Sequence, residues 1–252
     1  MTSITDAVAL VAAGVLAGLV GSAGGITSLI SYPALLAMGL PALRASITNS
    51  VALVACWPGS ALSSRSELRG SAGWLRRWML ITAVGGAAGA ALLLSTPPGV
   101  FERIVPGLIV VGSLALLFEP RLTAWRQRRG GSEGRFALPV GLLALSLYNG
   151  YFGAGSGVMT LTLLLLLVER RIAVANALKN MLIGAASVIS AAIFAVAGSV
   201  DWTKAVLLAL GMLVGSNLGP RAARRLPAPL LRVLIALLGI GLAIQLSVHP
   251  GT

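Results

Sequence analysis

The stretch that decides the fold is residues 148–168, YNGYFGAGSGVMTLTLLLLLV. Three of its glycines, at positions 153, 155 and 157, interrupt a largely apolar sequence, and glycine readily adopts backbone conformations that break a helix. The apolar run 158–168 that follows is short, because a helix needs roughly 20 apolar residues to cross a bilayer core. The stretch predicts a glycine turn followed by a half-helix or the second arm of a re-entrant hairpin. A short full span is the alternative, with the same loop orientation.

The chain as a whole has the composition of a membrane protein. Of its 252 residues 57% are hydrophobic and only 10% are charged, which is too little polar surface to cover a soluble domain. We expect an all-α polytopic membrane protein with about 8 full transmembrane helices plus short broken or re-entrant segments. Hydropathy places ten apolar segments at 7–20, 26–40, 45–63, 78–95, 104–118, 137–152, 158–168, 172–197, 205–220 and 230–248. The N-terminus lacks a basic stretch, so we do not expect a signal peptide.

The net charge of +12 is concentrated in short loops. Membrane proteins use such charges to set their orientation, so we expect no nucleic-acid partner. Fifteen of the 19 basic residues fall in four loops that we place in the cytoplasm, namely 65–77, 121–135, 170–171 and 221–232. The predicted location is the cell inner (plasma) membrane, multi-pass, with both termini outside.

The two halves of the chain resemble each other at an offset of about 130 residues. We divide the chain into a first repeat, 1–118, a cytoplasmic arginine-rich linker, 119–136, and a second repeat, 137–252. The matches are the glycine stretch 21–25 with 153–157, Arg44 to Asn49 with Val174 to Lys179, Gly85 with Gly215, and Gly89 with Gly219.

Equivalent loops of the two halves carry opposite charge patterns. Loop 65–77 is rich in arginine, whereas its counterpart 198–204 holds one acid and one lysine. Loop 96–103 is nearly neutral, whereas its counterpart 221–232 holds four arginines. We therefore predict that the halves are inverted in the membrane. Inverted repeats with interrupted helices are typical of secondary transporters, whose substrate site lies near the midplane.

Both glycine turns are candidate anion sites. The half-helices that start at Ile26 and Val158 point their N-termini into the turns, and free N–H groups at a helix start attract anions. The alternative is that these glycines only let helices pack closely, which is how we interpret the pairs Gly85/Gly89 and Gly215/Gly219. The substrate-binding candidates from the turns are Gly21, Ser22, Gly24, Gly25, Gly153, Gly155, Ser156 and Gly157.

Lys179 is a basic residue inside an apolar segment. It lies eight residues beyond Arg171, about 12 Å along a helix, where a charge is costly and indicates function. The alternative is a side chain that snorkels to the interface. No carboxylate is near in sequence, so an anionic substrate is the expected partner. The polar neighbours added to the candidate site are Asn176, Asn180, Thr48 and Asn49; Tyr148, Asn149 and Tyr151 either line the mouth of the second turn or anchor the chain at the interface.

Several reactive groups are missing from the predicted membrane segments. All seven carboxylates lie in loops or at segment edges, which disfavours cation transport. Cys56 is the only cysteine and His249 the only histidine, so we expect no metal site and no cofactor. We expect no enzyme activity, since a lysine-activated serine would need Lys179 within hydrogen-bond reach of a residue such as Ser28 or Ser156.

Taken in order, these motifs resemble the sulfite exporter TauE/SafE family over nearly the whole chain. The motifs are the first glycine turn with Pro33, the second turn from Tyr151 to Gly157, Ala175 with Lys179, Gly198 with Asp201 and Trp202, and Gly215 with Gly219. The resemblance implies a permease for sulfur-containing or organic anions, including sulfite and sulfoacetate. Three positions depart from the family pattern: Ser22-Ala23 stands for a denser glycine run, Leu178 for a polar residue, and Gly73 for an acid.

The expected function is a secondary transporter (permease or exporter) of a small anion by alternating access. The expected substrate is a sulfur oxyanion or organosulfonate such as sulfite. The alternatives are a passive anion channel and a permease for another small organic acid. The expected partners are the small anionic substrate and the lipid bilayer. A homodimer, the direction of transport and the coupling ion are left open.

Overall fold

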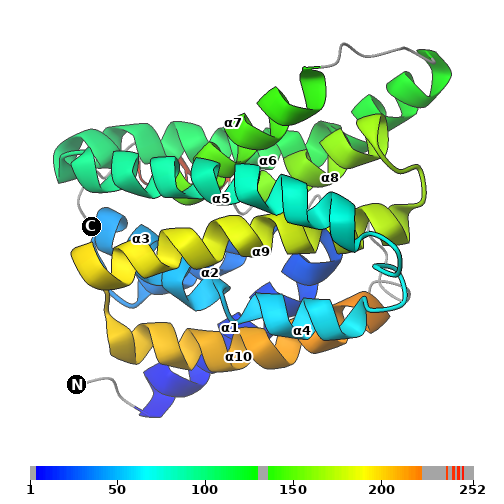
Figure 1. Ribbon diagram of the computed structural model, residues 1–252. Coiled ribbons are helices and arrows are strands. Elements are labelled where there is room, and N and C mark those ends of the chain that lie inside the picture. The colour runs from blue at the N-terminus through cyan, green and yellow to red at the C-terminus, as the bar shows by residue number, and fades with distance from the viewer. Residues whose placement is uncertain are drawn as a thin grey trace.

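The computed structural model describes residues 4–129 and 136–222, together with the isolated residues 237, 240, 241, 243, 244 and 246. Helices joined by short turns make up the described part, which confirms the all-α prediction (Figure 1). The helices are α1 (Ile4–Gly24), α2 (Ser28–Ala37), α3 (Ala42–Leu53), α4 (Cys56–Ser63), α5 (Ala72–Ser95), α6 (Pro98–Arg129), α7 (Ala137–Tyr151), α8 (Ser156–Leu167), α9 (Ile172–Ala197) and α10 (Trp202–Ala222). The predicted segment 230–248 lies outside the two continuous described ranges.

Five helices of the described part are long and apolar enough to cross a membrane, namely α1, α5, α6, α9 and α10. The polytopic membrane fold is thereby confirmed. α2 and α8 have ten and twelve residues, so they extend only about 15 and 18 Å. A bilayer core is about 30 Å thick. By length, each glycine turn is therefore followed by a helix too short to span.

The predicted segment 45–63 is divided in the structure into α3 and α4. Between them, the N–H of Ala55 donates to the carbonyl of Ala52, three residues back, at 3.1 Å. Pro58 explains the break, because proline has no N–H to donate to the carbonyl of Val54 and its ring crowds that carbonyl. The matching helix α9 contains no proline and runs unbroken.

The predicted segment 104–118 is also longer in the structure, and its helix enters the predicted linker 119–136. α6 continues through most of it and ends at Arg129. Its last residues are mainly leucine, alanine, glutamine and arginine, which favour a helix once one has started. The chain between the halves therefore begins as a helical extension of α6.

Among the described residues, α9 is the helix with the most buried side chains, and it runs through the middle of the protein between α5 on one side and α3 and α4 on the other (Figure 1). Two helix pairs flank it, α1 with α10 and α5 with α7. A Cβ on Gly85 would lie 2.9 Å from the carbonyl oxygen of Leu143 in α7, and a Cβ on Gly215 would lie 2.8 Å from the amide nitrogen of Leu19 in α1. The glycines at both positions let two backbones touch, as predicted. In each pair, the first helix of one half lies against the fourth predicted segment of the other.

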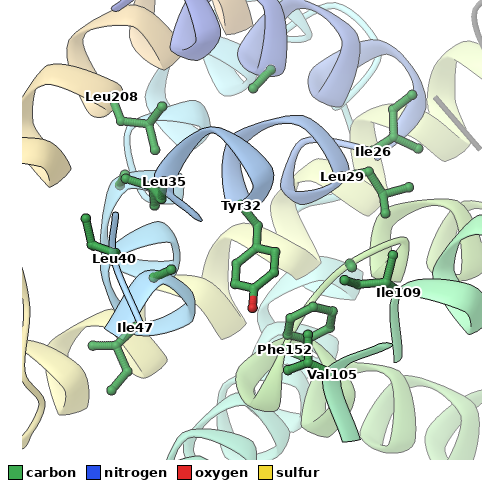
Figure 2. Packing of buried hydrophobic residues seen from close by; sticks show 14 of the residues in the cluster. Ile26, Leu29, Tyr32, Leu35, Leu40, Ile47, Val105, Ile109, Phe152 and Leu208 are labelled. Atoms are coloured by element: carbon green, nitrogen blue, oxygen red, sulfur yellow. The ribbon is translucent and has the colours of Figure 1, made fainter. Parts of the chain in front are cut away.

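The short helix α2 is enclosed by other parts of the chain (Figure 2). Its Leu29 and Tyr32 are 4% and 2% exposed, and the Tyr32 ring lies edge-on to Phe152, with 5.2 Å between centroids. Ile109 from α6 and Leu208 from α10 belong to the same buried cluster. A broken helix at membrane depth requires such a lining, because its end groups cannot face lipid.

Candidate anion site

The two glycine turns meet inside the protein. Gly25 follows α1 with φ of +77° and Gly153 follows α7 with φ of +80°, values that favour glycine. A Cβ on Gly25 would lie 2.5 Å from the carbonyl carbon of Gly157, and a Cβ on Gly157 would lie 2.6 Å from the carbonyl oxygen of Gly25. Because the turns touch backbone to backbone, no solute fits directly between these two residues. The space for a ligand lies beside their contact.

The positions at which α1 and α7 end change the sequence alignment of the two glycine turns. Gly25 and Gly153 both take the left-handed conformation just after a first helix, so the counterpart of Gly153 is Gly25. The sequence match of Gly21 with Gly153 is therefore wrong by about one helical turn. Both stretches are so rich in small residues that the sequence fits several registers.

The start of α8 offers free backbone donors. The N–H groups of Gly157 and Val158 have no acceptor among the described residues, and no side chain caps this helix start. The first N–H groups of a helix need partners from outside it, and the helix dipole adds roughly half a positive charge at this end. The turn beside Gly25 thus presents two unpaired donors and a positive dipole end.

Lys179 projects from α9 toward the same turns. Its side chain is 1% exposed, and its Nζ atom has no hydrogen-bond partner in the described part of the chain. It therefore does not reach the protein surface, and it forms no hydrogen bond with Ser28 or Ser156. Asn49, at the matching position of the first half, is also buried, but it is satisfied. Its Oδ1 accepts from Ser31 at 2.5 Å and its Nδ2 donates to Ser28 at 3.3 Å.

A cavity lies where Lys179 and the two turns come together, with about 60 Å³ available to the centres of water-sized groups. One water needs about 10–15 Å³ by this measure, so several such groups fit. The predicted residues that line it are Gly21, Gly25, Gly153, Ser156, Gly157, Lys179 and Asn180. Lys179 is the one charged side chain among its described lining residues.

Ser22 and Asn176 join α1 to α9 beside the cavity rather than lining it. The carbonyl of Ser22 accepts hydrogen bonds from the Nδ2 atoms of Asn176 at 3.0 Å and Asn180 at 3.3 Å. This carbonyl belongs to the last turn of α1, where carbonyls lack partners within the helix. The two asparagines therefore stabilise the broken end of α1 close to Lys179.

Two further candidates, Gly155 and Thr48, lie away from the cavity. Gly155 has φ of +75° and packs on α6, since a Cβ there would lie 2.7 Å from the Cα of Gly112. Gly24 is the last residue of α1. Thr48 is fully buried, and its Oγ1 accepts from the N–H of Asp201 at 3.1 Å. For Gly155 and Thr48, the structure favours packing and helix connection over ligand contact.

Thr48 can be tested directly. We expect Thr48→Val to lower the free energy of unfolding by about 1 kcal/mol, because the Asp201 N–H loses its acceptor. This corresponds to a melting temperature about 2–4 °C lower, measurable by thermal unfolding in detergent. Anion uptake into proteoliposomes should stay at the wild-type rate. A severalfold loss of uptake would instead indicate that Thr48 contacts the transported anion.

Of the three candidates Tyr148, Asn149 and Tyr151 before the second turn, Asn149 lines the cavity. Its Oδ1 accepts from Ser156 at 2.7 Å and its Nδ2 donates to Ser187 at 3.2 Å. Tyr148 fixes the turn instead, because its hydroxyl donates to the carbonyl of Ala154 at 2.7 Å. Tyr151 packs against Phe101, with 6.0 Å between ring centroids.

The cavity is also lined by Thr27, Ser28, Leu53 and Ile183, which the sequence analysis does not predict as substrate-binding residues. Helical spacing could have found two of them. Ile183 is four residues after Lys179 and Leu53 is four residues after Asn49, so each shares a helix face with a polar candidate. Ser28 could not be found this way, because its link to Asn49 joins two different helices.

With the site in place, comparison with known proteins becomes informative. The sequence matches the sulfite exporter TauE/SafE family over residues 7–246. The chain belongs to the TauE/SafE family. A probable membrane transporter protein of Haemophilus influenzae is 28% identical over 242 residues, which cover 94% of this chain and 93% of that protein. The probable membrane transporter protein YfcA of Escherichia coli K12 is 28% identical over 238 residues, covering 92% and 86%.

A Sinorhizobium probable membrane transporter protein is likewise 28% identical, over 96% of this chain and 92% of its own. No solved structure is significantly similar to this chain. Membership of the TauE/SafE family, together with the apolar helices, makes the chain a multi-pass membrane transporter.

Proposed function

We propose that this TauE/SafE protein is a secondary transporter that moves a small anion by alternating access. The observation that carries the proposal is the unpaired Nζ atom of Lys179, which faces a cavity walled by the glycine turns of both halves. An isolated buried charge is strongly unfavourable, whereas a charge paired with a ligand of opposite sign is not. An anion in the cavity is the partner that Lys179 lacks.

The other walls of the cavity favour the same kind of ligand. The free N–H group of Gly157, which lines the cavity, and the dipole of α8 add positive potential without a further charged side chain. The Ser28 hydroxyl accepts from Asn49 and keeps its own proton for a ligand oxygen. In a low-dielectric site such interactions are stronger than in water. A compact oxyanion with several acceptor oxygens suits this donor set.

We propose further that the two halves are inverted repeats that rock about this site. Two observations support the proposal: equivalent loops differ in charge, and the first helix of each half lies against the fourth segment of the other. The charge pattern also supports the cell inner membrane as the location, with arginine-rich loops in the cytoplasm and both termini outside.

For the substrate we propose a sulfur oxyanion or organosulfonate such as sulfite. The family description names sulfite export, and the cavity is of a size to hold a group of a few heavy atoms. A passive anion channel and a permease for another small organic acid are the alternatives.

A counterflow experiment separates these possibilities. Purified protein in proteoliposomes loaded with unlabelled sulfite, at mildly alkaline pH, should transiently accumulate radiolabelled sulfite from outside, because a carrier exchanges one bound anion for another. Sulfate, thiosulfate and acetate added outside would rank the substrate classes by competition. A channel would only equilibrate the label. Protein-free liposomes give the leak, and absence of sulfite uptake above that leak would refute sulfite as the substrate.

A further inference from the structure

The surroundings of Lys179 contain few groups that could stabilise a positive charge on its side chain when the cavity is empty. None of the other described residues lining the cavity is ionisable. Those from other helices are Gly21 of α1, Ser28 of α2 with Thr27 just before it, Leu53 of α3, Asn149 of α7, and Ser156 and Gly157 of α8. From α4, Cys56 lies near Lys179, but its neutral thiol carries no charge. On α5 and α3, the ionisable residues Arg76, Arg77 and Arg44 are exposed at the helix starts. No described carboxylate lies within hydrogen-bond reach of the amine.

An ammonium in this position without an anion is strongly unfavourable, since burial removes its water and nothing described replaces it. The neutral amine, with one lone pair and two N–H donors, has the lower free energy in the empty site. The matching position in the first half is the uncharged Asn49, bonded to two serines of α2. The fold therefore accommodates a neutral polar group at this place without a counterion.

We propose that Lys179 takes up a proton together with the anion and releases both on the other side, so that one proton accompanies each anion. The inference rests on the anion transport proposed above for the same cavity. The chemistry is balanced: the amine lone pair accepts a proton when the anion binds, and the N–H bond breaks again when the anion leaves. With a monovalent anion, the loaded and the empty site both carry no net charge, so transport of such an anion is electroneutral.

The test uses the full chain in proteoliposomes that contain a pH-sensitive dye. The probe is methanesulfonate, with sulfate as a second probe, because neither anion takes up a proton itself near neutral pH. We expect methanesulfonate uptake to acidify the lumen with one proton per anion. An inward proton gradient of about one pH unit should drive about tenfold accumulation, since one unit is 1.36 kcal/mol. A potassium diffusion potential should change the methanesulfonate rate little.

Two variants test which side chain, Lys179 or Cys56, binds the transported proton. The guanidinium of Lys179→Arg keeps its proton at all relevant pH values, so this variant should still exchange labelled for unlabelled anion while its net uptake becomes independent of the proton gradient. Cys56→Ala removes the other ionisable group near the site and should keep the one-to-one coupling. Loss of coupling in Cys56→Ala, or wild-type coupling in Lys179→Arg, would overturn the assignment to Lys179.

The results also separate this inference from the function on which it rests. Wild-type methanesulfonate uptake without proton uptake would refute the coupling and leave anion transport intact. Absence of uptake of both probes by the wild type would refute the proposed transport of sulfonates and sulfur oxyanions, and the coupling with it.

Discussion

Lys179→Ala is expected to lower the initial rate of anion uptake into proteoliposomes by at least about a hundredfold. Lys179 is the one charged side chain among the described residues of the cavity, and its Nζ atom has no other partner there. Truncating one member of a buried charge pair typically costs 2–5 kcal/mol, and 1.4 kcal/mol corresponds to about tenfold. The remaining N–H donors at the start of α8 cannot make up this difference, because a helix dipole supplies only about half a charge.

The same substitution should not reduce the amount of folded protein. It removes a buried group that forms no hydrogen bond in the described part of the structure, so the melting temperature of Lys179→Ala should equal or exceed that of the wild type. Lys204→Ala is the matched control. Lys204 pairs with Asp201 at 3.0 Å at the start of α10, away from the cavity, and this variant should retain uptake. Full uptake by Lys179→Ala would remove Lys179 from the site.

The sequence predicted the helices best where charge and glycine mark their ends. α9 begins after Arg171 and ends before Gly198, at the predicted bounds, because Arg171 stays exposed outside the apolar core and Gly198 is extended. The break between α3 and α4 was missed, although Pro58 signalled it, because hydropathy does not detect a missing N–H. The extension of α6 to Arg129 was missed because charged residues favour a loop by hydropathy yet are good helix formers.

The site was predictable to the extent that its members are unusual for a membrane. Lys179 and the glycine turns stand out in an apolar chain and line one cavity in the structure. The sequence could not separate Gly157, which faces the cavity, from Gly155, which packs on Gly112 of α6. Both are glycines two residues apart, and only the position of a distant helix distinguishes them. Contacts between helices likewise decide that Ser28 lines the cavity and Thr48 does not.

The contact of the two glycine turns gives the second large expected effect. We expect Gly25→Ala to lower the free energy of unfolding by more than about 3 kcal/mol, the sum of two separate penalties. A side chain at φ of +77° costs about 1–2 kcal/mol. Its Cβ would also lie 2.5 Å from the carbonyl carbon of Gly157, and overpacking against backbone that cannot rotate away costs typically 1–3 kcal/mol.

Two further variants separate these penalties. Gly39 has the same φ of +77° with no atom within 4 Å of an added Cβ, so Gly39→Ala should show the backbone cost alone and keep anion uptake. Gly157→Ala should show the steric cost alone, since Gly157 lies in α8 with ordinary helical φ. In detergent, the melting temperature of Gly25→Ala should then be lower than those of Gly39→Ala and Gly157→Ala. Uptake should fall in Gly25→Ala and Gly157→Ala, because separating the turns displaces the walls of the cavity beside Lys179. If Gly25→Ala and Gly39→Ala melt at the same temperature, the turns do not touch in the folded protein, and the site built on their contact is wrong.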